Sequence, residues 1–205
     1  MQDVTPYFTR SDGAYVFARW GRPIVPVVFG VDDATLSVFK GAIEAVVLLA
    51  NHEIGEVDTE LGANLMVFFC ADWAELTEVP HLARLVPDLA DLVARLHKAD
   101  ANQYRIFRFD DAGGIKAAFV FLRMDNHLAQ VPADTLALSQ AVQVILLWSD
   151  MAFTDTPPLA LINGNAVLHP EVADVIRAAY DPVMPVIARD PAHALRLAAR
   201  VQRPS

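Results

Sequence analysis

The segment 52–56 (HEIGE) begins like a catalytic zinc motif. In the HExxH motif, two histidines one helical turn apart hold the metal, and the glutamate takes a proton from the bound water. Here the fifth residue is Glu56 rather than histidine, and Gly55 stands where the helix that carries the metal has to be rigid. We therefore reject a zinc site at this segment and interpret it as a loop.

Acidic residues continue this loop at Glu56, Asp58 and Glu60. Their oxygens suit calcium, but the spacing of a calcium-binding loop is missing, so a solvated acidic loop is the favoured interpretation. None of the six histidines has another histidine four residues away, so a metal site would need ligands from distant parts of the chain. We expect no metal and no cofactor.

The common nucleophiles lack the neighbours that activate them. Cys70, the only cysteine, ends an apolar run without a cation or a helix start beside it, so we expect a buried, unreactive thiol. No serine lies in a G-x-S-x-G elbow, and no group of glycines has phosphate-binding spacing. The sequence therefore predicts no catalytic residue.

Two histidines lie where binding residues often occur. His127 follows a predicted hairpin and precedes a predicted buried helix, and His169 ends a loop that contains Asn165. Loops carry a large share of binding residues. His169 and Asn165 are therefore candidate ligand-binding residues.

Composition restricts the partners of this chain. Its 205 residues are 54% hydrophobic and 20% charged, which predicts a soluble single domain over residues 1–205 with a large core. The net charge of −9, without a basic cluster, argues against nucleic acid, and no apolar run approaches the roughly 20 residues of a membrane span. Part of the apolar surface could lie between subunits, so a homo-oligomer is an open alternative.

The beginning of the sequence lacks the basic-then-apolar organisation of a signal peptide. We therefore expect a cytoplasmic protein. A periplasmic or secreted protein is the alternative, if a signal peptide was removed.

Hydrophobic periodicity and turn residues predict an α+β fold, with a mixed β-sheet of four to six strands and about five helices. Pro26 indicates an edge position for its strand. The stretch 149–169 is expected to be a loop. Strands are expected at 14–20, 24–29, 63–70, 104–109 and 115–124, and helices at 34–50, 81–97 (split at Pro87), 132–148 (capped by Asp134), 170–180 and 191–201.

Several segments resemble the corresponding parts of an uncharacterised proteobacterial family of small zincin-like proteins. They are IKAAFVFLRM (115–124), SQAVQVILLWSD (139–150), LALINGNAVLHPEVAD (159–174), IRAAYDPVM (176–184), the W-x-x-P turn at 20–23 and ANLMVFF (63–69). The resemblance covers most of the chain, although much of it is hydrophobic patterning.

The resemblance implies that an edge strand, 115–124, precedes a helix, 132–148, in the position that carries the metal ligands of zincins. In the resembling family, acidic residues stand at the positions of Ser139 and Gln140, a glutamine matches Gln143, and Asp150 matches an aspartate after the helix. Hydroxyl and carboxamide groups are poor zinc ligands, and none can act as the general base. The resemblance therefore implies a degenerate, non-catalytic member.

We accordingly expect a non-catalytic zincin-like domain that binds a protein partner or a small ligand. The candidate ligand-binding residues are Gln140, Gln143, Asp150, Asn165 and His169. A hydrolase with an unrecognised active site and an oligomeric interaction subunit without a pocket are the alternatives.

Substitution of Gln140 or Gln143 by alanine is expected to lower the melting temperature more than any activity, because buried amides on a helix commonly make structural hydrogen bonds. Thermal denaturation and an activity assay on the same samples check this. A catalytic loss at an unchanged melting temperature would contradict it.

Overall fold

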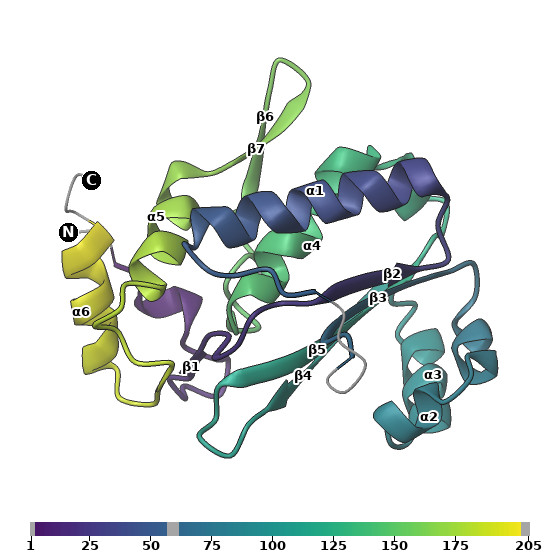
Figure 1. The fold of residues 1–205 in the computed structure, drawn as a ribbon, viewed down its shortest axis with the longest axis horizontal. Helices are drawn as coiled ribbons and strands as arrows, with labels where there is room; N and C mark the ends of the chain where they lie inside the picture. The colour runs from purple at the N-terminus through teal and green to yellow at the C-terminus, as the bar shows by residue number, and fades with distance from the viewer. Residues whose placement is uncertain (1–2, 57–61, 202–205) are drawn as a thin grey trace.

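The computed structural model describes residues 3–56 and 62–201, and at its centre lies a mixed four-stranded sheet (Figure 1). The strand order is β2-β3-β5-β4, with β2, β3 and β5 parallel and β4 antiparallel to β5. The strands are β2 (Pro26–Phe29), β3 (Leu65–Cys70), β4 (Gln103–Phe109) and β5 (Ile115–Arg123). The expected α+β class is confirmed, and so is the edge position of Pro26.

Helix α1 (Asp33–Leu49) makes the crossover between the parallel strands β2 and β3. Its first turn is capped by Asp32, whose carboxylate accepts a hydrogen bond from Thr35 N at 2.7 Å. Phe39, Ile43 and Val46 recur at helical spacing and are buried against the sheet. These local signals are the ones that predicted the helix.

Alternating side chains of the sheet enter two separate cores. On one face, α1 and α4 (Ala133–Ile145) pack on residues that include Val67 and Val120. On the other face, Phe68 and Phe121 lie under η2 (Trp73–Glu78), α2 (Leu82–Leu85) and α3 (Leu89–Lys98). Figure 1 shows these helices on opposite sides of the sheet.

The helical stretch after β3 is divided as expected. Asp72 and Glu75 form a reciprocal capping box at the start of η2. Pro87 separates α2 from α3, and Asp88 adopts a left-handed conformation with φ of 58° immediately before α3. Proline cannot donate the backbone hydrogen bond that a continuous helix needs, which explains the break.

The strand before α4 is not at an edge of the sheet. β5 pairs with β3 on one side and with β4 on the other, so β4 forms the edge of the sheet on that side. The order of a strand followed by a helix holds, whereas the edge position implied by the resemblance is wrong for 115–124. Strand pairing joins residues far apart in the chain, and local sequence patterns do not report it.

Helix α4 differs from expectation at both ends. Its N-cap is Pro132, while Asp134 lies within the first turn and its carboxylate accepts a hydrogen bond from Thr135 N at 2.7 Å. The helix ends at Ile145 rather than at 148, because Leu146 is extended, with φ of −133° and ψ of 158°. Leu147 N then donates to the carbonyl of Ala18 at 2.9 Å.

The C-terminal end of α4 is buried, and aromatic side chains satisfy its carbonyl groups. The last carbonyls of a helix have no partner within the helix, so a buried end needs donors from elsewhere. Here three such donors come from segments before, after and far beyond the helix. The hydrogen bonds are Trp148 Nε1 to Val142 O (2.7 Å), Trp20 Nε1 to Val144 O (2.8 Å) and Tyr180 Oη to Ile145 O (2.8 Å).

The stretch 149–169 is not all loop. It contains an antiparallel hairpin of β6 (Leu159–Ile162) and β7 (Asn165–Leu168), which projects from the layers in Figure 1. Asn163 and Gly164 form its two-residue turn with φ of 53° and 83°, and Asn-Gly is the preferred pair for such a turn. The Asn-Gly pair was a usable hairpin signal that the loop interpretation overlooked.

The remaining elements close one end of the molecule. α5 (Pro170–Ala179) begins with proline at its first position, as expected, and α6 (Ala192–Val201) packs against it. The expected strand 14–20 is reduced to β1 (Phe17–Ala18), which pairs antiparallel with β8 (Ile187–Ala188). Short 3-10 turns lie at η1 (Thr5–Tyr7) and η3 (Leu128–Gln130).

None of the helices in residues 3–56 and 62–201 has the length and apolarity required to span a membrane.

Replacing Tyr180 by phenylalanine should lower the free energy of unfolding by about 1–3 kcal/mol, because the buried carbonyl of Ile145 loses its donor while the ring remains. Urea denaturation measures the difference. Tyr104→Phe is the matched control, since the Tyr104 hydroxyl makes no hydrogen bond to any of the described residues, and it should change the stability much less. Equal losses in both variants would contradict the role of this hydrogen bond.

Candidate functional site: the groove beside helix α4

A groove of about 270 Å³ runs beside helix α4. Its walls come from α4, from η3 before it, from the start of β4, and from the segment that leads into β6. Most of its surface is apolar, and a few polar groups interrupt it. The apolar residues are Leu128, Val131, Leu136, Pro157, Pro158, Leu159 and Leu161, and the polar ones are Gln103, His127, Thr135, Ser139 and Gln140.

Two glutamines of this groove hold an arginine. Arg105 Nη2 donates to Gln140 Oε1 at 3.0 Å and to Gln103 Oε1 at 3.3 Å. Gln140 Nε2 donates to Gln103 Oε1 at 2.8 Å, which closes the cluster. Gln140 is only 3% exposed, so the oxygen and the nitrogen of its carboxamide both depend on these partners.

Arg105 has no counter-charge. No carboxylate lies within ion-pair distance of it in the described part of the chain. Its enclosed Nε has no hydrogen-bond partner, and burial lowers its pKa to about 10. Taking a guanidinium out of water without an anion is costly, so this cation is held at a cost in stability.

The alternation of β4 explains the position of the arginine. Arg105 is paired with Val120, and Gln103 with Leu122, and both partners belong to the core under α4. Tyr104 and Ile106 point to the opposite core. A strand was expected at 104–109, but Gln103 and Arg105 were not among the candidate residues. An arginine in phase with the residues that face a buried helix was the signal that could have identified the cluster.

The candidate residues on α4 are close together. Gln143 Nε2 donates to Ser139 Oγ at 2.8 Å, as expected for residues one turn apart. Ser139 and Gln140 line the groove, while Gln143 reaches it through Ser139. Within the described residues, no hydrogen bond joins Ser139 to a histidine or a carboxylate, so its hydroxyl lacks an activating base.

The other three candidates do not line this groove. Asp150 binds the Ser11 backbone N–H at 3.0 Å and also the Ser11 hydroxyl. Asn165 is exposed at the tip of the β6–β7 hairpin, and His169 is the N-cap residue of α5. None of these three residues lines the groove, so the five candidates are not brought into one site.

The HEIGE segment forms no metal centre in the described residues. His52 Nε2 lies 2.9 Å from the carbonyl of Arg22, and the imidazole lies against Tyr180 with ring centroids 5.1 Å apart. In residues 3–56 and 62–201, no three histidine, cysteine or acidic side chains are grouped so that they could hold a metal. Asp58 and Glu60 of the predicted acidic loop lie outside the described residues.

The Cys70 thiol is buried at the end of β3, and its Sγ lies 3.7 Å from the carbonyl of Leu122. Burial raises the pKa of this thiol to about 12, with smaller contributions from Glu75 and Asp72. The thiol is therefore protonated at neutral pH, in agreement with the expected unreactive side chain.

No family model, no curated protein and no solved structure matches this chain. The candidate site is therefore defined by its own residues, and its most unusual neighbour is Arg105, a partly buried arginine with no carboxylate among the described residues within ion-pair distance.

A second buried polar pair joins Tyr15 to His193 of α6. The Tyr15 hydroxyl lies 2.8 Å from His193 Nδ1, and His193 is 4% exposed with no partner for its Nε2. Burial lowers the pKa of His193 to about 4, and the charge of Arg196 adds to this shift. Burial also lowers the pKa of His52. Both histidines are therefore neutral in the folded protein at pH 7.

The free energy of unfolding should fall as the pH decreases from about 6.5 to 4. In this window the unfolded chain binds protons at both histidines, while folded His193 stays neutral until about pH 4. Urea denaturation at pH 7 and pH 4.5 measures the loss. It should be smaller in the double variant Tyr15→Phe/His193→Phe, and unchanged in the control His81→Gln, whose histidine is exposed. An identical loss in the double variant would contradict the assignment.

Proposed function

We propose that this protein is a non-catalytic binding domain, and that its groove beside α4 binds a small carboxylate with an apolar tail. The observation that carries the proposal is the partly buried guanidinium of Arg105, which two amide oxygens hold and no carboxylate of the described residues neutralises.

The charge of Arg105 favours an anionic ligand. Amide oxygens compensate a guanidinium only in part, whereas a carboxylate can accept two parallel hydrogen bonds from it. Gln103 and Gln140 line the groove and hold Nη2, so they connect the ligand space to the cation. A carboxylate that displaces the Gln103 oxygen takes hydrogen bonds from Arg105 and from Gln140 Nε2, and it neutralises the buried charge.

The shape and lining of the groove favour an apolar tail. Its volume of about 270 Å³ is near the lower end for small-molecule sites, and leucines, prolines and a valine make up most of the lining. Leu161, which is 72% exposed, belongs to this lining. Contact with a ligand tail removes such surface from water and stabilises the complex.

The side chains of α4 support binding rather than hydrolysis. Ser139, Gln140 and Gln143 occupy the helix that would carry the ligands and the base of a zincin-like metallopeptidase. They are engaged with one another and with Arg105. A hydroxyl whose side-chain partner is a carboxamide has no base to accept its proton, because amides do not act as general bases. A zincin-like origin with loss of the metal site agrees with this proposal.

Octanoate should raise the melting temperature by about 5–10 °C at a hundredfold excess over its Kd, because ligand that binds only the folded state adds about 2.7 kcal/mol. Octanol and octylamine carry the same tail with neutral and positive head groups, and they should give little shift. Differential scanning fluorimetry compares the three ligands.

Arg105→Met should abolish the octanoate shift. The unliganded variant should change little in stability, since the removal of an unpaired cation offsets the loss of the donor to Gln140 Oε1. Arg108→Met on the same strand is the control, because Arg108 points to the opposite face, where its Nη2 lies 3.5 Å from the carbonyl of Leu85. A full octanoate shift in the Arg105 variant, or equal shifts with octylamine, would refute the proposal.

A further inference from the structure

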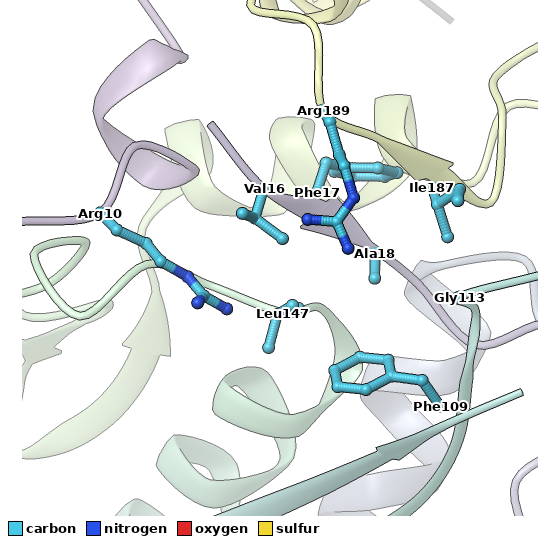
Figure 2. Close-up of a pocket in the computed structure, with 9 residues that line it drawn as sticks. All are labelled: Arg10, Val16, Phe17, Ala18, Phe109, Gly113, Leu147, Ile187 and Arg189. Carbon is cyan, nitrogen blue, oxygen red and sulfur yellow. The ribbon is translucent and has the colours of Figure 1, made fainter. Parts of the chain in front are cut away.

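A second cavity, of about 200 Å³, lies at the end of the molecule where five segments meet (Figure 2). The first two segments are the N-terminal segment with Arg10 and the region of β1. The others are the β4–β5 turn, Leu147 after α4, and the region of β8. None of its lining residues belongs to the groove beside α4.

Two arginines face this cavity from different walls. Figure 2 shows the side chains of Arg10 and Arg189 extending from separate segments, with both guanidinium groups turned toward the space between them. In residues 3–56 and 62–201, neither side chain makes an ion pair within 4.0 Å, and the cavity lining contains no aspartate or glutamate. Two positively charged side chains therefore line a cavity whose own lining holds no carboxylate, in a chain whose net charge is −9.

Asp150 and Asp190, which lie close to these arginines along the chain or through Ser11, make hydrogen bonds of their own. Asp150 is hydrogen-bonded to the backbone N–H and hydroxyl of Ser11, and these bonds lower its pKa, with a smaller effect from the charge of Arg10. Asp190 accepts a hydrogen bond from Ala192 N at 2.9 Å at the start of α6. These acids fix the turns that carry the arginines and leave the guanidinium groups directed at the cavity.

The backbone also holds Arg10 in place. Arg10 N donates to the carbonyl of Ala14 at 2.9 Å, and Gly13 N donates to the carbonyl of Arg10 at 2.9 Å. Two backbone hydrogen bonds close this tight turn, and Ser11 ties it to Asp150. The turn therefore fixes the position of the Arg10 backbone. Such preorganisation lowers the cost of ordering a binding residue.

The rest of the cavity is apolar. Val16, Leu147 and Ile187 line it, and the ring of Phe109, which is 39% exposed, faces it in Figure 2. Exposed rings of this kind pack against flat apolar groups. The cavity thus offers two cations for one end of a ligand and an aromatic wall for the other.

We propose that this cavity binds a phosphate monoester with a small aromatic body. A phosphate monoester carries a charge near −2 at neutral pH, which matches the two arginines, and its three oxygens can accept hydrogen bonds from both planar guanidinium groups. The aromatic body lies against Phe109 and Leu147. The inference does not depend on the function proposed for the groove beside α4, because the two sites share no residue.

Isothermal titration calorimetry with phenyl phosphate at pH 7.5 and low salt tests this inference. Benzenesulfonate is the matched ligand, since it has the same ring and three oxygens but a single negative charge, and it should bind at least tenfold more weakly. Inorganic phosphate, which lacks the ring, should also bind more weakly.

Arg10→Gln and Arg189→Gln should each weaken phenyl phosphate binding roughly tenfold or more. Both residues are exposed, so the melting temperatures should not change. Arg95→Gln is the control for net charge, because α3 contributes no residue to the cavity, and it should retain the affinity. Arg105→Met should also retain it, which separates this site from the groove.

Three results would overturn the inference. The first is no heat of binding with phenyl phosphate at millimolar concentration in the original protein. The second is equal affinity for benzenesulfonate or for inorganic phosphate. The third is an equal loss of affinity in the Arg95 variant, which would indicate a general charge effect rather than a site.

Discussion

The buried C-terminal end of α4 is the constraint on which the rest of this structure depends. Its free carbonyl groups lie in the core, where water cannot reach them, so they need donors from the protein. Trp20, Trp148 and Tyr180 provide these donors from three separate segments. Each segment has to pass close to the helix end, and this requirement draws the N-terminal part of the chain and the α5–α6 region onto the central layers. The groove lies along this helix, and the second cavity lies just beyond its end.

The two candidate sites use arginine in different physical settings. Arg105 is partly buried, and burial lowers its pKa to about 10, so an anion that binds there offsets the cost of an unpaired charge. Arg10 and Arg189 are exposed and remain hydrated. The affinity proposed for a phosphate there comes from matching its charge and from the hydrogen-bond donors of two planar guanidinium groups. On an acidic protein, both sites are local exceptions to a surface that repels anions.

The proposed zincin-like origin can be compared with the observed fold at helix α4. A strand followed by a helix is present, but the strand is interior, with β4 outside it. Where a metallopeptidase needs imidazole and carboxylate, this helix carries Ser139, Gln140 and Gln143, and these side chains form hydrogen bonds with one another and with β4. If the proposed zincin-like origin holds, amides in place of metal ligands give the groove polar groups for binding rather than hydrolysis.

Local features of this protein could be derived from the sequence because they arise between near neighbours. The Asp32 cap, the break at Pro87, the proline that opens α5 and the β4–β5 hairpin all follow from residues a few positions apart. The α+β class followed from their order. By contrast, the inner place of β5, the early end of α4, and the enclosure of Arg105 depend on segments distant in the chain. Hydrophobic periodicity indicates which face of an element is buried, but it does not indicate what lies opposite, and the polar partners of Gln140 come from that opposite strand.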